Sequence, residues 1–338
     1  MQGEGSRRAA SNGYGGSGSA DVLHGPAASI SELLRLLAAG AAAAIILALG
    51  DGPLRTKVLT EQVAVYTPRT IYRYLPKLTE LGAVRREEGA EAPAKVVHRL
   101  TDPAGIQLHH LVRRLSDPSL GWLRDDRTGA PAWGSLGVLA DLWDAGVVEA
   151  LSRGARSPTE LARGLEGLSY HQVNRRALLF KEAGFLCEWE QLQGQQRCYA
   201  LTDKARRAMG LIAALGWWRS RNLAGRGDTG MTVSETATVL RASLPLVKLP
   251  DQAGKRLEIY VAGKGAEAGP GEGLWLEVDV DGGLNPCEAP SAGATGSGRG
   301  DPEAWLATIL DGKPRIATEG DEGLVAACLG GLAGKLWT

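Results

Sequence analysis

The amino-acid sequence predicts an α+β protein, in which two winged helix-turn-helix domains are followed by a small α/β domain. Three observations lead to this prediction. One segment occurs twice, each copy combines a helical pattern with two short strands, and the charge changes sign after residue 226. At 338 residues, 44% of them hydrophobic, the chain is long enough to fold into two or three domains.

The repeat is visible as a fixed offset of 102 positions between the two copies. The same offset continues upstream, where residues 45–53 align with residues 147–155. A single offset that keeps apolar and glycine positions in register indicates two copies of one structural unit. The matched positions are Ile71 with Val173, Leu75 with Ala177, Leu78 with Phe180 and Gly82 with Gly184.

Residues 1–28 are rich in glycine and serine and are expected to be disordered. The apolar run Leu36–Gly50 that follows is predicted to be a buried core helix. It is too short to span a membrane and lies too far into the chain for a signal peptide. Its repeat partner, residues 139–152, carries three acidic residues. We therefore expect a cytoplasmic protein without a membrane partner.

Residues 67–100 form the first recognition element. Thr67 can cap a helix, and Pro68 suits the first helical position. Apolar residues at spacings of three and four then form a buried stripe, and residues 84–88 and 95–100 are predicted to be the two strands of a wing. Pro76 interrupts this helix, where it should cost about 3 kcal/mol or impose a kink. The stripe consists of Ile71, Leu75, Leu78 and Leu81.

The face of the helix opposite this stripe carries side chains that can form paired hydrogen bonds with bases or bind phosphates. The basic side chains of the wing would meet phosphates or the minor groove. The predicted partner is double-stranded DNA. The candidate DNA-binding residues are Arg69, Thr70, Arg73, Lys77, Arg85, Arg86 and Lys95 in the first unit, and His171, Gln172, Asn174 and Arg175 in the second.

The charge distribution agrees with this interpretation. The whole chain has a net charge of zero, but residues 29–115 hold 12 Lys and Arg against 8 Asp and Glu, a charge of +4. Residues 133–226 hold 13 against 9, again +4, whereas residues 227–338 hold 9 against 16, a charge of −7. Two basic units and one acidic unit suit DNA contact by the first two. A charge of +4 is also common on ordinary protein surfaces.

A family resemblance rests on the motifs Asp51–Arg55, Leu78–Arg86 and Leu100–Gly105. Their order resembles that of the HxlR-type winged-helix transcription regulators of bacteria, over residues 29–115 and more weakly over residues 133–222. The resemblance implies a DNA-binding regulator that works as a homodimer. In the second copy Arg153–Ser157 replace the first motif, and Glu188 and Glu190 make the wing less basic. One copy would then be a packing unit rather than a reader.

Residues 116–132 form a connector short enough to hold the two units side by side. This suggests that one chain presents two recognition helices and imitates a dimer. The long apolar helix expected over residues 205–223, which contains Trp217 and Trp218, would either pair two chains or belong to the core.

The third domain, residues 227–338, is predicted to contain helices at 237–249, 303–310 and 322–336 and strands at 255–262, 273–281 and 313–318, with a flexible glycine-rich loop at 291–300. The motifs Pro302–Leu306, Leu310–Gly312 and Leu276–Gly282 resemble a sterol-carrier-protein-like domain. That resemblance implies an apolar tunnel for a hydrophobic small-molecule effector. The residues expected to line this tunnel are Leu276, Val278, Trp305, Ile309 and Leu329. The alternative is that these residues fill a core.

The sequence shows no catalytic or metal-binding pattern, so we expect no enzyme, no cofactor and no metal. Cys187 and Cys198 flank the second wing, where a redox switch is conceivable, although a cytoplasmic protein keeps such thiols reduced. An enzyme in the third domain is the contrasting hypothesis, and turnover by residues 227–338 alone would support it. The main alternative to a regulator is a protein-interaction module, which would lack the steep salt dependence of DNA binding.

Overall fold

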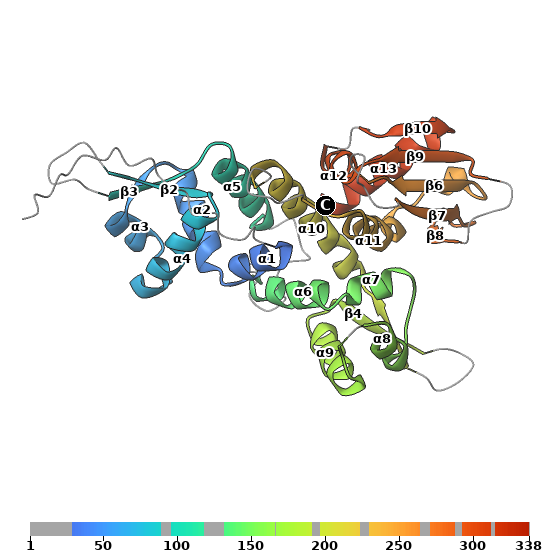
Figure 1. Ribbon diagram of the computed structural model, residues 1–338, viewed down its shortest axis with the longest axis horizontal. Helices are drawn as coiled ribbons and strands as arrows, with labels where there is room; N and C mark the ends of the chain where they lie inside the picture. Colours follow the sequence, from blue (N-terminus) through green and yellow to red (C-terminus); the bar gives the residue numbers. More distant parts are fainter. Residues whose placement is uncertain are drawn as a thin grey trace, which may run out of the picture.

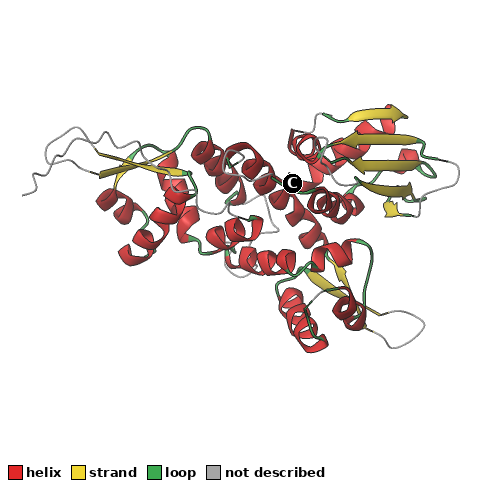
Figure 2. Cartoon of the chain, in the orientation of Figure 1, coloured by secondary structure: helices red, strands yellow, loops and turns green. Residues whose placement is uncertain are grey.

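The computed structural model of the protein describes residues 29–88, 96–117, 132–165, 167–190, 197–223, 230–263, 271–287, 293–311 and 315–337. Three predictions from the sequence lie outside these ranges. They are the disordered tail over residues 1–28, the wing residue Lys95, and most of the connector over residues 116–132. Helices occupy the centre of the molecule, and the three sheets lie around them (Figures 1 and 2).

The first unit forms a helical core with a three-stranded wing. The strand order is β1-β3-β2, and both pairings are antiparallel. The predicted recognition helix and both wing strands are present at the expected positions. The elements are α1 (Ile30–Ala38), α2 (Ala41–Gly50), β1 (Leu54–Arg55), α3 (Thr56–Gln62), α4 (Pro68–Glu80), β2 (Val84–Glu88), β3 (Val96–Leu100) and α5 (Ala104–Leu115).

The apolar run 36–50 is not one helix, as expected from the sequence, but the junction of two. Helix α1 ends at Ala38, and α2 leaves it at an angle of 85°. Gly40 makes this turn with a φ of 68°, a backbone conformation that residues with a Cβ rarely adopt. A Cβ at this position would also collide with the hydroxyl of Tyr66. The chain therefore turns at Gly40, where a residue with a side chain would not fit, and α1 and α2 form as separate helices.

Helix α4 begins and continues as its sequence predicts. The Thr67 hydroxyl accepts a hydrogen bond from the amide of Thr70 at 3.3 Å, and Ile71, Leu75 and Leu78 are buried. The helix continues through Pro76, which lies on the exposed side. Pro76 has no N–H, so one carbonyl group in the preceding turn lacks its helical hydrogen bond. Because this side of the helix is exposed, water can bind that carbonyl group.

The second unit has its elements in the same order as the first. The equivalence extends to the base of the wing, where Arg156 forms a bridge with Tyr199 just as Leu54 pairs with His98. The elements are α6 (Gly134–Asp144), α7 (Val147–Ser152), α8 (Pro158–Gly164), α9 (Tyr170–Glu182), β4 (Leu186–Glu190), β5 (Arg197–Leu201) and α10 (Asp203–Asn222).

The two units meet through equivalent helices. Helix α1 packs on α6, and α5 packs on α10. At the first contact the Arg35 guanidinium binds the carboxylates of Asp141 at 2.8 Å and Asp144 at 2.7 Å. At the second, the Trp218 indole donates a hydrogen bond to the carbonyl of Ala104 at 2.8 Å. Reciprocal use of the same elements is the arrangement that a two-fold axis produces in a symmetric dimer.

Helix α10 joins all three parts of the chain. Besides α5 and α1, it contacts the third-domain helices α11 (Val233–Ser243), α12 (Pro302–Asp311) and α13 (Glu322–Trp337). Its apolar residues, including Met209, Ile212 and Trp218, are buried by these contacts. Of the two alternatives for this helix, pairing of two chains or a place in the core, the structure supports the core, because its apolar residues are covered within one chain.

The third domain is a five-stranded sheet with helices on one face. The strand order is β10-β9-β6-β7-β8, in which β6 and β9 are parallel and the other neighbours antiparallel. Helices α11, α12 and α13 contact the sheet, and α11 also packs on α7 of the second unit. The strands are β6 (Arg256–Val261), β7 (Glu272–Val278), β8 (Leu284–Pro286), β9 (Gly296–Gly300) and β10 (Ala317–Gly320).

The glycine-rich segment that the sequence analysis treated as a flexible loop contains an inner strand, β9. A Cβ at Gly298 would lie 3.1 Å from the ring of Trp305 and 2.8 Å from Ile316, so a side chain there would displace α12 from the sheet. The glycines of β9 therefore allow close packing of a helix on the strand. Glycine composition alone does not distinguish this use from a loop.

No single helix in the described part of the chain is long and apolar enough to cross a membrane. Only α1 and α2 taken together have the necessary length and composition, and they are bent by 85°. Both helices contribute to the hydrophobic core.

Candidate nucleic-acid interface

The exposed face of α4 presents three cationic side chains. Arg69, Arg73 and Lys77 are exposed, and none of them forms an ion pair with a residue that the structure describes. The guanidinium carbon of Arg73 and the Nζ of Lys77 lie 5.9 Å and 5.6 Å from the centre of the Tyr74 ring. Both side chains therefore pack beside this ring. These three residues occupy the positions that the sequence analysis gave them.

Thr70, in contrast, belongs to the helix cap. Its hydroxyl lies 2.9 Å from that of Thr67, and its side chain is half-buried. A residue that the sequence analysis did not select is Tyr72, whose side chain is 58% exposed on the flank of the same helix. Its exposure could have been foreseen, since position 72 lies off the stripe formed by residues 71, 75 and 78.

The first wing is only partly available to an anionic partner. Arg85 forms an ion pair with Glu87 at 2.7 Å, and Arg99 approaches the same carboxylate oxygen at 3.7 Å. Arg86 is exposed and pairs across the wing with His98. Of the predicted wing contacts, Arg86 has no ion-pair partner in the described part of the chain, Arg85 is partly neutralised, and Lys95 lies outside the described residues.

His98 ties the wing to the helix-turn-helix. Its Nε2 lies 3.0 Å from the Thr56 hydroxyl on α3, and its side chain is only 7% exposed. The other ring nitrogen, Nδ1, is buried with no hydrogen-bond partner in the described structure. Burial, and secondarily the charge of Arg86, lower the pKa of His98 below its usual value.

This shifted pKa predicts that acid destabilises the protein. Below pH about 6.5 the unfolded chain binds a proton at His98 that the folded protein resists, so the free energy of unfolding falls as the pH decreases. Replacing His98 by glutamine should reduce this loss, measured as the urea midpoint at pH 7.5, 6.5 and 5.5. His109 keeps a residual slope of the same sign, because burial also lowers its pKa.

The exposed His171 provides the matched control for this prediction. His98→Gln should narrow the difference between the midpoints at pH 7.5 and 5.5 by more than the same substitution at His171 does. An equal slope in His98→Gln and the wild-type protein would show that protonation of His98 does not contribute.

In the second unit, two of the four predicted contact residues are engaged elsewhere. The Gln172 side chain accepts a hydrogen bond from the amide of Ser169 at 2.8 Å, which completes a capping box. The Asn174 amide oxygen accepts a bond from the Tyr199 hydroxyl at 3.5 Å. His171 and Arg175 remain exposed on the outer face of α9. The neighbouring Arg176, which the sequence analysis did not select, is also exposed on this helix. Any contact from α9 to DNA would depend mainly on these three residues.

The remainder of this α9 face is unlike that of α4. Leu178 and Leu179 are 46% and 52% exposed at the positions where the first unit has Pro76 and Lys77. The wing strand β4 carries Glu188, which pairs with Lys181 of α9 at 2.9 Å and so reduces the positive charge of this helix. This hydrogen bond lowers the pKa of Glu188. The second unit therefore offers fewer free cations at this face than the first.

The residues selected for a hydrophobic ligand are completely buried between the sheet and helices of the third domain. Trp305 donates a hydrogen bond from its indole to the carbonyl of Tyr260 at 3.1 Å. None of the three cavities with described linings is bordered by these side chains. The ligand site stays a prediction. Leu276, Val278, Trp305, Ile309 and Leu329 are each at most 2% exposed.

The two wing cysteines do not lie opposite each other. In the β4–β5 pairing Cys187 faces Ala200 and Cys198 faces Trp189, and both thiols are free. Among the described residues no group of three His, Cys, Asp or Glu side chains could hold a metal ion.

Comparison with known proteins relates part of the chain to helix-turn-helix regulators. Residues 41–126 match the family described as HxlR-like helix-turn-helix. A segment of 58 residues is 40% identical to an uncharacterized HTH-type transcriptional regulator of Halalkalibacterium halodurans, which corresponds to 17% of this chain and 51% of that protein. The chain thus spans about half the length of this curated relative. With the geometry above, these matches make the first unit a winged helix-turn-helix domain.

Proposed function

Starting from this HxlR-like first unit, we propose that the chain is a DNA-binding transcription regulator. Its two units, residues 29–115 and 133–226, would be tandem winged helices that bind adjacent half-sites of double-stranded DNA. The observation that carries the proposal is the outer face of α4, where Arg69, Arg73 and Lys77 are exposed and have no ion-pair partner among the described residues. Unpaired guanidinium groups on a recognition helix can donate two hydrogen bonds to a guanine or bind phosphates.

The packing of the two units supports the proposal that one chain has two DNA-binding surfaces. Equivalent helices meet at both contacts, α1 with α6 and α5 with α10, as the two halves of a symmetric dimer would. In Figure 1, α4 and α9 both lie toward the lower edge of the molecule, and the third domain lies at the upper right. DNA could therefore run along the lower edge without meeting the third domain.

The two units would contribute unequally to the affinity for DNA. Arg69, Arg73, Lys77 and Arg86 in the first unit form no ion pair with a described residue. In the second unit the same holds only for Arg175, Arg176 and the imidazole of His171 on α9. We therefore expect the first unit to supply most of the affinity, and the second to add a weaker half-site. Affinity for the paired site still exceeds that for one half-site, since the second contact is intramolecular.

The third domain would be the sensor of the regulator, with a sterol-carrier-like fold and a hydrophobic effector. Two inter-domain ion pairs could transmit a change in this domain to the second unit. Arg221 on α10 lies 3.5 Å from Glu303 on α12, and Arg153 lies 3.6 Å from Glu272 on β7. Opening of the buried cluster around Trp305 to admit a ligand would move α12, and α10 with it.

The direct test is fluorescence anisotropy of the full-length protein with DNA from its own upstream region and with scrambled DNA, over a salt series. The affinity for the upstream DNA should be higher. Its logarithm should fall with the logarithm of salt concentration by about 0.9 per phosphate neutralised. Equal affinity for both DNAs at every salt concentration would contradict the proposal.

The number of half-sites per chain is tested separately by footprinting and light scattering. We expect a monomer in solution that protects two adjacent half-sites. Protection of one half-site per chain would show that the second unit does not read DNA.

One observation favours a second candidate function, in which α9 contacts a protein. Leu178 and Leu179 give this helix an exposed apolar surface that a DNA major groove does not require. If the chain binds no DNA above the nonspecific level, the winged helices would be protein-docking modules.

A further inference from the structure

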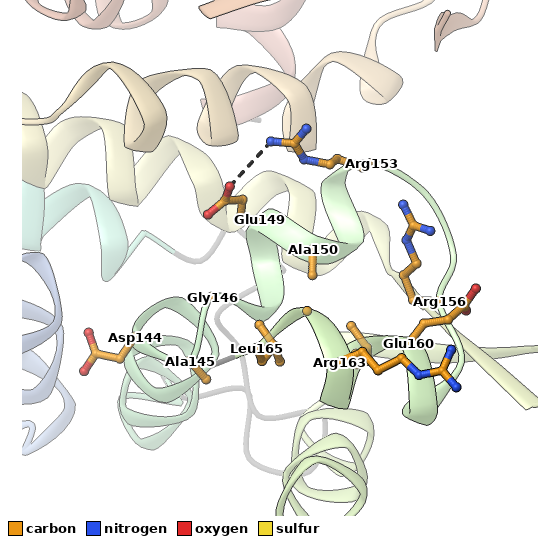
Figure 3. A pocket seen from close by; sticks show the side chains of 12 residues that line it. Asp144, Ala145, Gly146, Glu149, Ala150, Arg153, Arg156, Glu160, Arg163 and Leu165 are labelled. Carbon is orange, nitrogen blue, oxygen red and sulfur yellow. Dashed lines mark ion pairs between the residues drawn. The ribbon is translucent and has the colours of Figure 1, made fainter. Parts of the chain in front are cut away.

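A groove in the second unit is separate from both the recognition helix and the sheet of the third domain. It lies between the turn that joins α6 to α7, helix α7 and helix α8, with a volume of about 740 Å³ (Figure 3). Its rim carries Arg153, Arg156 and Arg163, and its floor includes Leu161 and Leu165. A volume of this size is typical of sites for small organic molecules.

The three carboxylates that border the groove already have partners. Asp144 binds Arg35 at 2.7 Å, and Glu149 binds Arg153 at 3.5 Å. Glu160 accepts hydrogen bonds from the amide and the hydroxyl of Ser157, at 2.7 Å and 2.9 Å, as part of the α8 cap. These bonds lower the pKa of Glu160 and keep it ionised in its place. Asp144 and Glu149 each have a cationic partner. Glu160 keeps its negative charge, because its hydrogen-bond partners are neutral, and this charge acts on both Arg156 and Arg163. Two guanidinium groups thus share the field of one carboxylate, which leaves an excess of positive charge at this rim.

The guanidinium groups are not all satisfied in this way. Arg153 is shared between Glu149 and Glu272. Neither Arg156 nor Arg163 forms a hydrogen bond or ion pair through its side chain with a described residue. Arg156 is moreover half-buried, so it is held near the groove rather than extended into water. Two unpaired guanidinium groups thus border one cavity.

The repeat provides an internal comparison for these arginines. At the equivalent positions the first unit has Asp51, Leu54 and Glu61. The backbone is the same in both units at this point, because Leu54 and Arg156 make equivalent bridges to the wing. The fold of the unit therefore does not require any of the three arginines.

The floor of the groove is apolar. Ala150 on α7 and Leu161 and Leu165 on α8 line it between the charged groups. Leu161 and Leu165 are only 1% and 8% exposed, so they form a fixed surface rather than a mobile one. A ligand that lies on this floor with its charged end at Arg156 and Arg163 would bury apolar area and bind the guanidinium groups at once.

From this arrangement we propose that the groove is a binding site for a small amphipathic organic anion. Its carboxylate or phosphate group binds Arg156 and Arg163, and its ring-sized apolar body packs on Ala150, Leu161 and Leu165. The planar guanidinium fork recognises both kinds of anion in the same way. The site is distinct from the hydrophobic pocket expected in the third domain, and it does not depend on DNA binding.

The test is isothermal titration calorimetry of the full-length protein with 1-naphthoate, 1-naphthyl phosphate and the neutral 1-naphthalenemethanol. At least one of the two anions should bind saturably and at least tenfold more tightly than the alcohol. The anion that binds more tightly identifies the charged group. Arg156→Gln and Arg163→Gln should each weaken its binding at least tenfold. Arg113→Gln, which removes an exposed arginine on α5, should not change it.

A further variant tests the apolar floor without altering charge. Ala150→Phe fills the groove and should abolish binding, while its circular dichroism spectrum and urea midpoint report that the protein is folded. Three results would overturn the proposal: no saturable binding of either anion, equal binding of the alcohol, or unchanged binding in both arginine variants. If those variants instead weaken DNA binding as Arg175→Ala does, the two arginines are phosphate contacts and the groove is not a ligand site.

Discussion

Replacing Arg69 and Arg73 together by alanine is expected to abolish sequence-specific DNA binding. Both side chains lie on the outer face of α4, and neither is held by an ion pair with a described residue. A guanidinium group that reads a base contributes about 1 to 3 kcal/mol, so the double substitution should cost about 2 to 6 kcal/mol. Anisotropy at fixed salt would record a loss of affinity between about 30-fold and 10⁴-fold.

The single variant Arg73→Ala shows which kind of contact is lost. If Arg73 reads a guanine, the loss should be confined to sites with that base pair, and specificity at one position should relax. If it contacts a phosphate, affinity should fall equally for all sequences and the salt slope should decrease by about 1.

A matched control removes two exposed cations far from α4. Arg113 lies on α5 and Lys335 on α13, and Arg113→Ala with Lys335→Ala makes the same change in net charge. This variant should keep its affinity within about twofold, since it alters only the long-range field. Similar losses in both double variants would show that net charge, rather than the α4 face, determines binding.

Replacing Trp218 by alanine is expected to cause a large loss of stability. Its side chain is 2% exposed on α10 and bonds to the carbonyl of Ala104 in the first unit. Loss of a buried tryptophan costs about 3 to 5 kcal/mol, because apolar burial is lost and a cavity remains. Urea unfolding followed by circular dichroism should show this decrease. It should also separate the first unit from the others as an earlier transition.

The neighbouring Trp217 is the control for this substitution. It is only partly buried, and Arg221 lies over its ring at 5.5 Å from the centroid. Trp217→Ala should therefore lower the free energy of unfolding by less than Trp218→Ala and leave a single transition. Equal losses in the two variants would show that α10 does not hold the units together through Trp218.

Local sequence patterns were sufficient for the elements of the recognition region. Thr67 and Pro68 begin α4, and the apolar spacing that follows identifies its buried side. The same reasoning correctly predicted β2 and β3, because caps, apolar period and strand alternation act over a few residues. It also correctly placed Arg69, Arg73 and Lys77 on the exposed face.

Side-chain roles within that region were harder to predict. Thr70 and Gln172 have the composition of DNA contacts, but both take part in the caps of their own helices. Arg85 has the charge expected for a phosphate contact, but Glu87 partly neutralises it. Sequence spacing gives the direction of a side chain from its helix or strand. The partner it selects depends on which groups folding brings within about 3 Å.

The sequence by itself determined the helix α4 with its cap and the basic character of the first two units, and its fixed offset predicted the same order of elements in both units. These features follow from local periodicity and charge, which do not require knowledge of distant contacts. Tertiary structure decided where the chain turns at Gly40, how the glycines of β9 let Trp305 pack on the sheet, and what covers α10. It also brought Arg156 and Arg163 to the same groove. In each of these cases the outcome depends on close approach between residues far apart in the chain, because packing and electrostatic energies act over a few ångströms of space rather than along the sequence.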